Sequence, residues 1–238
     1  MTAVPPPSSP APKEAPGWKA LACVLVCGYV DAYTLLTLGV YTSFMSGNTA
    51  STGMDAEQAK FAAAGHSLLP VPSFLLGAFI GALLQGRKDG AQVARVLVLT
   101  ATILVAVMAA TGYAAPGWLC TVGLSAAMGM LNTAIVHIGR QSINLGFVTG
   151  DIRSFAQHLV DALNRVPVSQ AESPRDTHWR RMCVLASTWV VFLAGAVLGS
   201  VMETHLGAWA LALPASVLFA LAVRTPPPHP ILGPSMAR

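Results

Sequence analysis

Charged residues are scarce in this sequence. Lysine and arginine contribute 14 of its 238 residues and aspartate and glutamate 10, so that 10% of the chain is charged and 54% is hydrophobic. Soluble domains usually carry about 25% charged residues. The shortage argues against a soluble domain and indicates a chain whose main solvent is lipid. The net charge of +4, with no dense run of lysine and arginine, argues against nucleic acid as a partner.

The sequence also lacks the local motifs of catalytic and metal centres. Its four cysteines lie in or beside apolar runs, which indicates small buried side chains rather than a disulfide framework. We find no Gly-x-Ser-x-Gly motif, phosphate-binding loop or dinucleotide fingerprint, so we expect neither an enzyme nor a bound cofactor. Because no His-x-x-x-His or Glu-x-x-His spacing occurs, we expect no metal site. The six histidines are His66, His137, His158, His178, His205 and His229.

Long apolar runs are what the chain has in place of charge. Six of them approach the ~20 residues that a helix needs to cross ~30 Å of hydrocarbon. They cover residues 18–39, 68–86, 93–114, 118–139, 182–202 and 206–223. We therefore expect an all-α, polytopic membrane protein with a single membrane domain over residues 18–223. Residues 1–17, rich in proline, serine and alanine, are predicted to be a disordered tail, and residues 224–238 form a second tail.

The distribution of positive charges predicts the orientation of these runs. With the N-terminus in the cytoplasm, every lysine and arginine except Lys60 falls on the cytoplasmic side, as the positive-inside rule requires. Both termini, and both tails, are therefore predicted to be cytoplasmic in a multi-pass protein of the plasma membrane. Residues 166–178, with two prolines and several charges, are predicted to form an exposed cytoplasmic linker.

Two halves of the chain carry the same landmarks in the same order. Residues 44–49 read Phe-Met-Ser-Gly-Asn-Thr, and residues 147–152 read Phe-Val-Thr-Gly-Asp-Ile. Behind each copy lies a glycine-spaced apolar run, over residues 74–81 in the first half and 192–199 in the second. This agreement predicts an internal duplication.

The duplication divides the membrane domain into two repeats, residues 18–114 and residues 118–223. Because each repeat holds three apolar runs, an odd number, the second repeat must enter the membrane from the opposite side. We therefore expect six transmembrane helices arranged as a 3+3 inverted-topology repeat, an architecture that many transporters build around a central site.

Each repeat also contains a segment that is too polar for a membrane span. Residues 42–54 are rich in serine, threonine and asparagine, and residues 143–163 have apolar side chains at helical spacing, a pattern typical of an amphipathic helix. Helices that begin there have suitable N-cap residues in Ser46, Asn48, Thr149 and Asp151. Two arrangements remain open, namely interfacial helices on opposite membrane surfaces or half-helices that dip inward, shielded by protein.

Five short stretches stand out in combination, at residues 28–32 (Gly-Tyr-Val-Asp-Ala), 44–49, 74–81, 129–134 (Gly-Met-Leu-Asn-Thr-Ala) and 147–151. Together they resemble the YoaK-like family of bacterial inner-membrane proteins, which is defined by a domain of unknown function. The resemblance covers residues 18–223 and implies a six-span bacterial membrane protein, but it supplies no activity, substrate or catalytic residue. Ser46 stands where the family usually has threonine. Asp151 also stands where threonine is common, which makes the second copy more acidic.

Asp31 is an acid inside the first predicted span. It lies about 18 Å beyond Lys19 along a helix, at a depth where an ionised carboxylate costs a few kcal/mol and is a functional residue by default. Its repeat partner is Asn132, and we expect the two side chains to approach each other across the repeat axis. For a titrating transport residue, Asp31→Asn should leave folding intact because it removes a costly charge. The alternative is that Asp31 only fastens helices together.

These features predict a small-solute transporter or channel-like permease of the bacterial inner membrane. Its substrate or ion pathway, between the two repeats, is predicted to be lined by Asp31, Ser46, Asn48, Asn132, Thr149 and Asp151. Close helix packing, within the monomer or in a homo-oligomer, is predicted at Gly77, Gly81, Gly195 and Gly199. The alternative is a non-transporting scaffold or sensor whose polar residues serve helix packing. An intramembrane enzyme is the least favoured class because no nucleophile–base pair is visible.

Overall fold

The computed structural model describes residues 17–85, 90–134, 137–138, 141–142, 148–168, 171 and 176–225. The predicted N-terminal tail up to residue 16, the C-terminal tail from residue 226 and the side chain of Thr149 lie outside the described part of the chain. What is described is helical, apart from two antiparallel two-residue strands, β1 (His137–Ile138) and β2 (Gln141–Ser142). The all-α class is therefore correct for the architecture.

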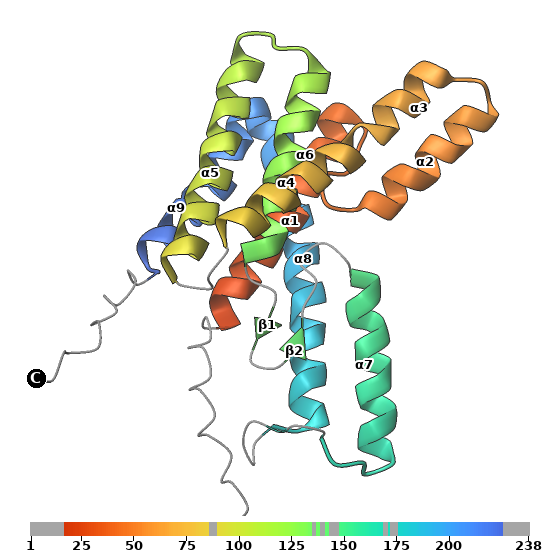
Figure 1. Ribbon diagram of the computed structural model, residues 1–238, viewed down its shortest axis with the longest axis vertical. Helices are drawn as coiled ribbons and strands as arrows, with labels where there is room; N and C mark the ends of the chain where they lie inside the picture. Colours follow the sequence, from red (N-terminus) through yellow and green to blue (C-terminus); the bar gives the residue numbers. More distant parts are fainter. Residues whose placement is uncertain are drawn as a thin grey trace, which may run out of the picture.

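The helices follow the order of the predicted apolar and polar segments (Figure 1). They are α1 (Gly17–Leu38), α2 (Met45–Glu57), α3 (Phe61–Leu68), α4 (Pro70–Leu84), α5 (Gly90–Gly112), α6 (Gly117–Ala134), α7 (Val148–Leu163), α8 (His178–Leu206), the 3-10 helix η1 (Gly207–Leu211) and α9 (Ala212–Val223). The two polar segments thus form α2 and α7, each of which begins at the second residue of its landmark motif.

Four stretches of the described chain are long and apolar enough to cross a membrane, which indicates a membrane protein. They are Gly17–Leu38, Phe61–Leu84, Gln92–Gly112 and His178–Val223. The last, of 46 residues, contains both the fifth and the sixth predicted spans, and η1 divides them. Gly207, the first residue of η1, has a φ of 53°, in the left-handed region that glycine enters without steric cost. The fourth predicted span forms α6, but α6 is not among the four stretches.

Two pairs of helices cross at glycines, which set how closely their backbones approach. On α1, a Cβ at Gly28 would overlap the carbonyl oxygen of Phe192 on α8. On α6, a Cβ at Gly129 would overlap the carbonyl oxygen of Phe74 on α4. Glycine therefore permits backbone contact in both pairs, as small residues do between membrane helices.

The predicted packing glycines lie in the same two crossings. A Cβ at Gly195 would meet the backbone of Leu25, and one at Gly199 would meet the backbone of Tyr29. On the other pair, a Cβ at Gly77 would overlap the carbonyl oxygen of Ala126. A Cβ at the fourth, Gly81, would meet residues Met130 and Thr133 of α6.

The opposite face of α4 is apolar and exposed. Leu75, Phe79 and Leu83 recur every four residues and are 60% to 69% exposed. They are offset by two positions from Gly77 and Gly81, which places them about 200° away around the helix. Apolar side chains of this kind belong in lipid when the opposite face is packed against protein.

The start of α1 and the end of α9 lie side by side. The Lys19 ammonium donates to the carbonyl oxygen of Arg224 at 2.9 Å and to Thr225 Oγ1 at 3.2 Å. Further along α1, the Tyr29 hydroxyl donates to the carbonyl oxygen of Ala210 in η1 at 2.8 Å. The chain therefore enters and leaves the helical domain at the same end.

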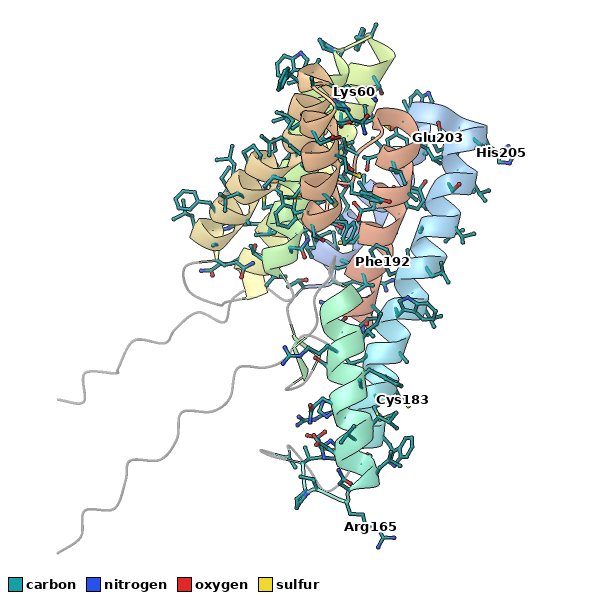
Figure 2. All side chains as sticks on the ribbon, turned by 90° about the vertical axis from the view of Figure 1, so that its right-hand side faces the viewer. Lys60, Arg165, Cys183, Phe192, Glu203 and His205 are labelled. Carbon is teal, nitrogen blue, oxygen red and sulfur yellow. The ribbon has the colours of Figure 1, made fainter. Side chains whose placement is uncertain are left out.

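The two polar helices project at opposite ends of the molecule, α2 with α3 at one end and α7 at the other (Figure 1). Figure 2 shows Lys60 at the same end of the molecule as Glu203 and His205, where α8 finishes, whereas Arg165 lies at the far end. Lys60, the one basic residue predicted to lie outside the cell, is thus separated from Arg165 by the length of the domain.

Candidate functional site

The carboxylate of Asp31 binds the loop that follows α1. Oδ1 accepts hydrogen bonds from the backbone N–H groups of Thr42 and Ser43, both at 2.8 Å, and from Thr42 Oγ1 at 3.0 Å. Oδ2 accepts from Ser43 Oγ at 2.5 Å. The Asp31 side chain is 4% exposed, and Thr42 and Ser43 are fully buried. The acid therefore has four donors, all from two successive residues of one loop.

The backbone at the end of α1 explains how the loop reaches Asp31. Gly39 follows the last residue of α1 and has a φ of 70°, the left-handed conformation that commonly ends a helix. Its N–H donates to the carbonyl oxygen of Leu35 at 3.1 Å. The chain thus turns back after α1, and residues 42 and 43 return to the side chain two turns before the helix end.

Asn48 holds the same loop from the other side. Its Oδ1 accepts from the backbone N–H of Tyr41 at 3.0 Å, and its Nδ2 donates to the carbonyl oxygen of Tyr41 at 2.6 Å. The residue is 2% exposed. Asp31 and Asn48 therefore belong to one cluster, which we call the loop clasp: Asp31, Tyr41, Thr42, Ser43 and Asn48.

The N-cap predictions for the first copy are wrong. The N-cap of α2 is Phe44, with no side-chain cap hydrogen bond, and both Ser46 and Asn48 lie inside the helix. Asn48 lies three residues after the start of α2, and its amide binds the backbone of Tyr41 instead. Ser46 is exposed and stands outside the loop clasp. In the second copy α7 begins at Val148, so Asp151 lies in the first turn of the helix rather than before it.

Asp151 lies between α7 and α8. It is 4% exposed, and its Oδ2 accepts a hydrogen bond from Thr188 Oγ1 of α8 at 3.0 Å. Asp151 and Asn48 occupy the same position of their landmark motifs. Each is buried and connects its polar helix to another part of the chain.

Asn132 and Asp31 do not form a hydrogen bond among the described residues. The Asn132 amide donates to the carbonyl oxygen of Met128, one turn back in its own helix, at 2.9 Å. Of the six residues predicted to line a pathway, Asp31 and Asn48 bind the same loop, and Asp151 bonds to Thr188 of α8. Ser46 and Asn132 lie outside the loop clasp, and the side chain of Thr149 is not described.

Two further polar groups lie inside the helical domain and were not singled out by the sequence. Thr100 of α5 and Ser125 of α6 are fully buried, and neither hydroxyl has a hydrogen-bond partner within the described part of the chain. A buried hydroxyl without a partner costs about 1–3 kcal/mol. Such groups in a native protein call for an explanation, and binding of a polar molecule is one.

A second polar cluster joins α7 to the start of α8. The Nδ1 atoms of His158 and His178 are 3.0 Å apart, and the ring centroids are separated by 5.2 Å. Asp161 lies one turn along α7 from His158, and its carboxylate completes a group whose ligand atoms all lie within 4.8 Å of one another. This group of three, the α7–α8 cluster, could hold a metal ion.

Most described residues of the linker predicted to be exposed, 166–178, are exposed, but two beside this cluster are not. Asp176 is 8% and His178 9% exposed, because both turn inward where α8 begins. Asp176 forms a bidentate ion pair with Arg181, with N–O distances of 3.1 and 2.8 Å. Burial lowers the pKa of His158, and His178 and Arg181 lower it further against the opposing charges of Asp161 and Asp176, so the ring is neutral near pH 7.

Sequence reasoning missed the cluster because it searched for ligands at short spacing. His158 and Asp161 are three residues apart on α7, which was a visible signal, but His178 is twenty residues further along the chain. Only the packing of α7 against α8 places the third ligand beside the other two.

Comparison with known proteins identifies the family of the chain. A family model described as "Protein of unknown function (DUF1275)" matches residues 19–224, the region over which the motifs resemble the YoaK-like family. No curated protein and no solved structure matches the chain significantly.

Proposed function

The chain belongs to the family described as "Protein of unknown function (DUF1275)", and since that description specifies no activity, we propose from the fold that this member is a small-solute transporter or channel-like permease of a bacterial inner membrane. The supporting observation is the exchange of helices between the two halves of the chain. An early helix of each half packs on a later helix of the other, α1 on α8 and α6 on α4.

The two crossings use matching positions. Gly28 precedes Asp31 by three residues, and Gly129 precedes Asn132 by three. Their contacts, Phe192 and Phe74, each precede a glycine of the spaced runs by three residues. Matching residues in matching contacts are what a duplicated, 3+3 inverted arrangement of six spans requires. Its two halves would rock against each other around a site between them, the mechanism that such repeats serve in transporters.

The orientation that we propose places both termini in the cytoplasm. The adjacency of Lys19 and Arg224 supports a common side for both ends of the domain, and the separation of Lys60 from Arg165 along the molecule (Figure 2) agrees with the positive-inside rule. The loop clasp then faces outward, and the α7–α8 cluster faces the cytoplasm.

The loop clasp secures the start of α2, and the contact of Asp151 with Thr188 secures the start of α7. In a transporter, they would stabilise the segments that close the pathway, while the solute contacts groups deeper inside. The unpartnered hydroxyls of Thr100 and Ser125 are the best candidates for that inner contact.

One observation favours the alternative of a non-transporting scaffold or sensor. The Asp31 carboxylate and the Asn48 amide are both engaged by the chain's own loop, which is the use that a packing role predicts. The two functions differ in whether the interior opens to water.

Thiol accessibility tests this difference without knowledge of the substrate. Ser125→Cys changes one atom at a fully buried site, and Ala127→Cys, also fully buried and on the same helix, is the matched control. Both are made in a Cys183→Ser background, because Cys183 is the only exposed cysteine of the four. The purified protein is reconstituted in vesicles and treated with a membrane-impermeant maleimide from outside or from within.

A transporter predicts that Ser125→Cys reacts from at least one side and that Ala127→Cys reacts no faster than the parent protein. Equal protection of both positions from both sides would refute the permease and support a closed scaffold. A panel of metabolites and ions, screened for those that slow labelling at Ser125→Cys and raise Tm, then identifies the solute class.

A further inference from the structure

The α7–α8 cluster has the composition of a transition-metal site. Two imidazole nitrogens and one carboxylate oxygen come from His158, His178 and Asp161, and their ligand atoms lie within 4.8 Å of one another. His158 and Asp161 project from the same face of α7 because residues three apart are neighbours on a helix. His178 reaches them as the first residue of α8.

The tautomer of His178 is fixed by the backbone. Its Nε2 lies 3.0 Å from the carbonyl oxygen of Val166, and since a carbonyl only accepts hydrogen bonds, Nε2 carries the proton. The Nδ1 atom of His178 then carries no proton, and its lone pair faces Nδ1 of His158. A metal-binding histidine almost always donates its other ring N–H to a carbonyl or a carboxylate in this way.

The carboxylate is also oriented. Gln157 Nε2 donates to Asp161 Oδ1 at 3.1 Å, which leaves the second oxygen able to turn towards the imidazoles. A hydrogen bond between the two imidazoles would by itself explain the 3.0 Å between their Nδ1 atoms. It would not explain why the Asp161 carboxylate lies beside both rings, or why the Val166 carbonyl holds the other nitrogen of His178.

The position of the cluster gives an ion access from water. Helix α8 has 29 residues and is therefore about 43 Å long, which exceeds the ~30 Å of hydrocarbon. Arg180 and Arg181, beside the cluster, mark the end that extends beyond the lipid. The three ligands are half-buried or at the limit of burial.

We propose that His158, Asp161 and His178 bind one divalent transition-metal ion, of the Zn²⁺ class, which joins α7 to the start of α8. Nitrogen donors select Zn²⁺, Fe²⁺, Ni²⁺ or Cu²⁺ over Mg²⁺ and Ca²⁺, which prefer oxygen. Three protein ligands leave a fourth position for water or for a group from outside the chain. The ion would couple the amphipathic helix to the long helix whether or not the protein transports a solute.

The test uses the full chain in detergent, purified without a polyhistidine tag and stripped with a chelator. Zn²⁺ binding is measured by competition with a chromogenic chelator, for the wild type and for His158→Gln, Asp161→Asn and His178→Gln. His205→Gln is the matched control, because His205 is exposed at the opposite end of α8 (Figure 2). Tm is recorded with and without Zn²⁺.

We expect one Zn²⁺ per wild-type and per His205→Gln chain. Each ligand variant should lose affinity by at least about tenfold, because loss of an outer-shell partner alone costs about 10–100-fold. Zn²⁺ should raise Tm only where it binds, and Mg²⁺ should not substitute for it. No binding by the wild type, or binding that survives all three substitutions, would overturn the proposal. For any ligand variant that fails to fold, the ligand-field spectrum of wild-type protein with Co²⁺ decides, since a spectrum without nitrogen ligation would also overturn it.

Discussion

Ser43 contacts both oxygens of Asp31: its hydroxyl donates to Oδ2 at 2.5 Å, and its backbone N–H donates to Oδ1 at 2.8 Å. One loop residue thus engages both oxygens of a carboxylate that is almost completely buried in α1. With the two donors of Thr42, this contact ties the loop before α2 to the interior of the domain. The acid is therefore a structural anchor at this position, whatever solute the protein handles.

Asp31→Asn should destabilise the fold. An amide offers one acceptor oxygen and one donor nitrogen, so an N–H group would replace the oxygen that faces the hydroxyl of Ser43. That hydroxyl would have to turn from donor to acceptor, and the hydrogen bonds to a carboxylate, worth about 1.5–3 kcal/mol each, would become weaker neutral ones. This reverses the expectation from sequence that asparagine would be tolerated. Tm in detergent measures the effect, with Glu57→Gln on the exposed end of α2 as control, and an unchanged Tm would show that the clasp contributes nothing.

Gly28→Ala and Gly129→Ala should both disrupt folding, and to a similar degree. Each new methyl group would overlap a carbonyl oxygen of the crossing helix, that of Phe192 or that of Phe74, so the helices would have to separate. Gly53→Ala and Gly65→Ala are matched controls, because a Cβ there meets nothing within 4 Å, and alanine should stabilise a helix by up to about 1 kcal/mol. Yield of monodisperse protein and Tm measure the outcome. Tolerance of alanine at position 28 but not at 129 would contradict matching roles for the two crossings.

Lys60→Cys should be labelled by an impermeant maleimide in intact cells, and Arg165→Cys should not. Both side chains are exposed and lie at opposite ends of the domain (Figure 2). A difference in labelling therefore reports the side of the membrane and not a difference in exposure. The background is again Cys183→Ser, and permeabilised cells provide the control in which both positions react. Labelling of Arg165→Cys in intact cells would reverse the proposed orientation.

Thr188→Val should loosen α7 without unfolding the helical domain. The substitution keeps the shape of the side chain but removes the hydroxyl that donates to Asp151, and hydrogen bonds to charged groups contribute about 1.5–3 kcal/mol. Amide hydrogen exchange in α7 should increase while exchange in α1 stays the same, and Thr188→Ser should retain most of the protection. Uniformly faster exchange in both helices would mean that the contact stabilises the whole domain.

The sequence by itself determined where the helices lie. The first predicted span, residues 18–39, corresponds to α1 (Gly17–Leu38), and the amphipathic pattern over 143–163 corresponds to α7 (Val148–Leu163). These features are local, because hydrophobic length and a 3.6-residue period are properties of one segment and do not depend on its neighbours. The same holds for the family resemblance, which short motifs carried and the match over residues 19–224 bears out.

Only the tertiary structure decided which polar side chains meet. Symmetry of the repeats predicted Asn132 as the partner of Asp31, but the left-handed turn at Gly39 returns Thr42 and Ser43 to the carboxylate instead. The position of Asp31 along α1 can be counted from the sequence. Its hydrogen-bond partners depend instead on the conformation of the loop that follows the helix.

The α7–α8 cluster is a second case in which the sequence alone does not predict which side chains meet, here between residues further apart in the chain. His158 and His178 are in contact because two helices pack side by side, and no spacing in the sequence records that packing. Side-chain pairs within one helix are set by its period, but pairs between helices are set by the angle and register at which the helices cross. Those quantities arise from the whole bundle, where close backbone approach at glycines fixes which faces can touch.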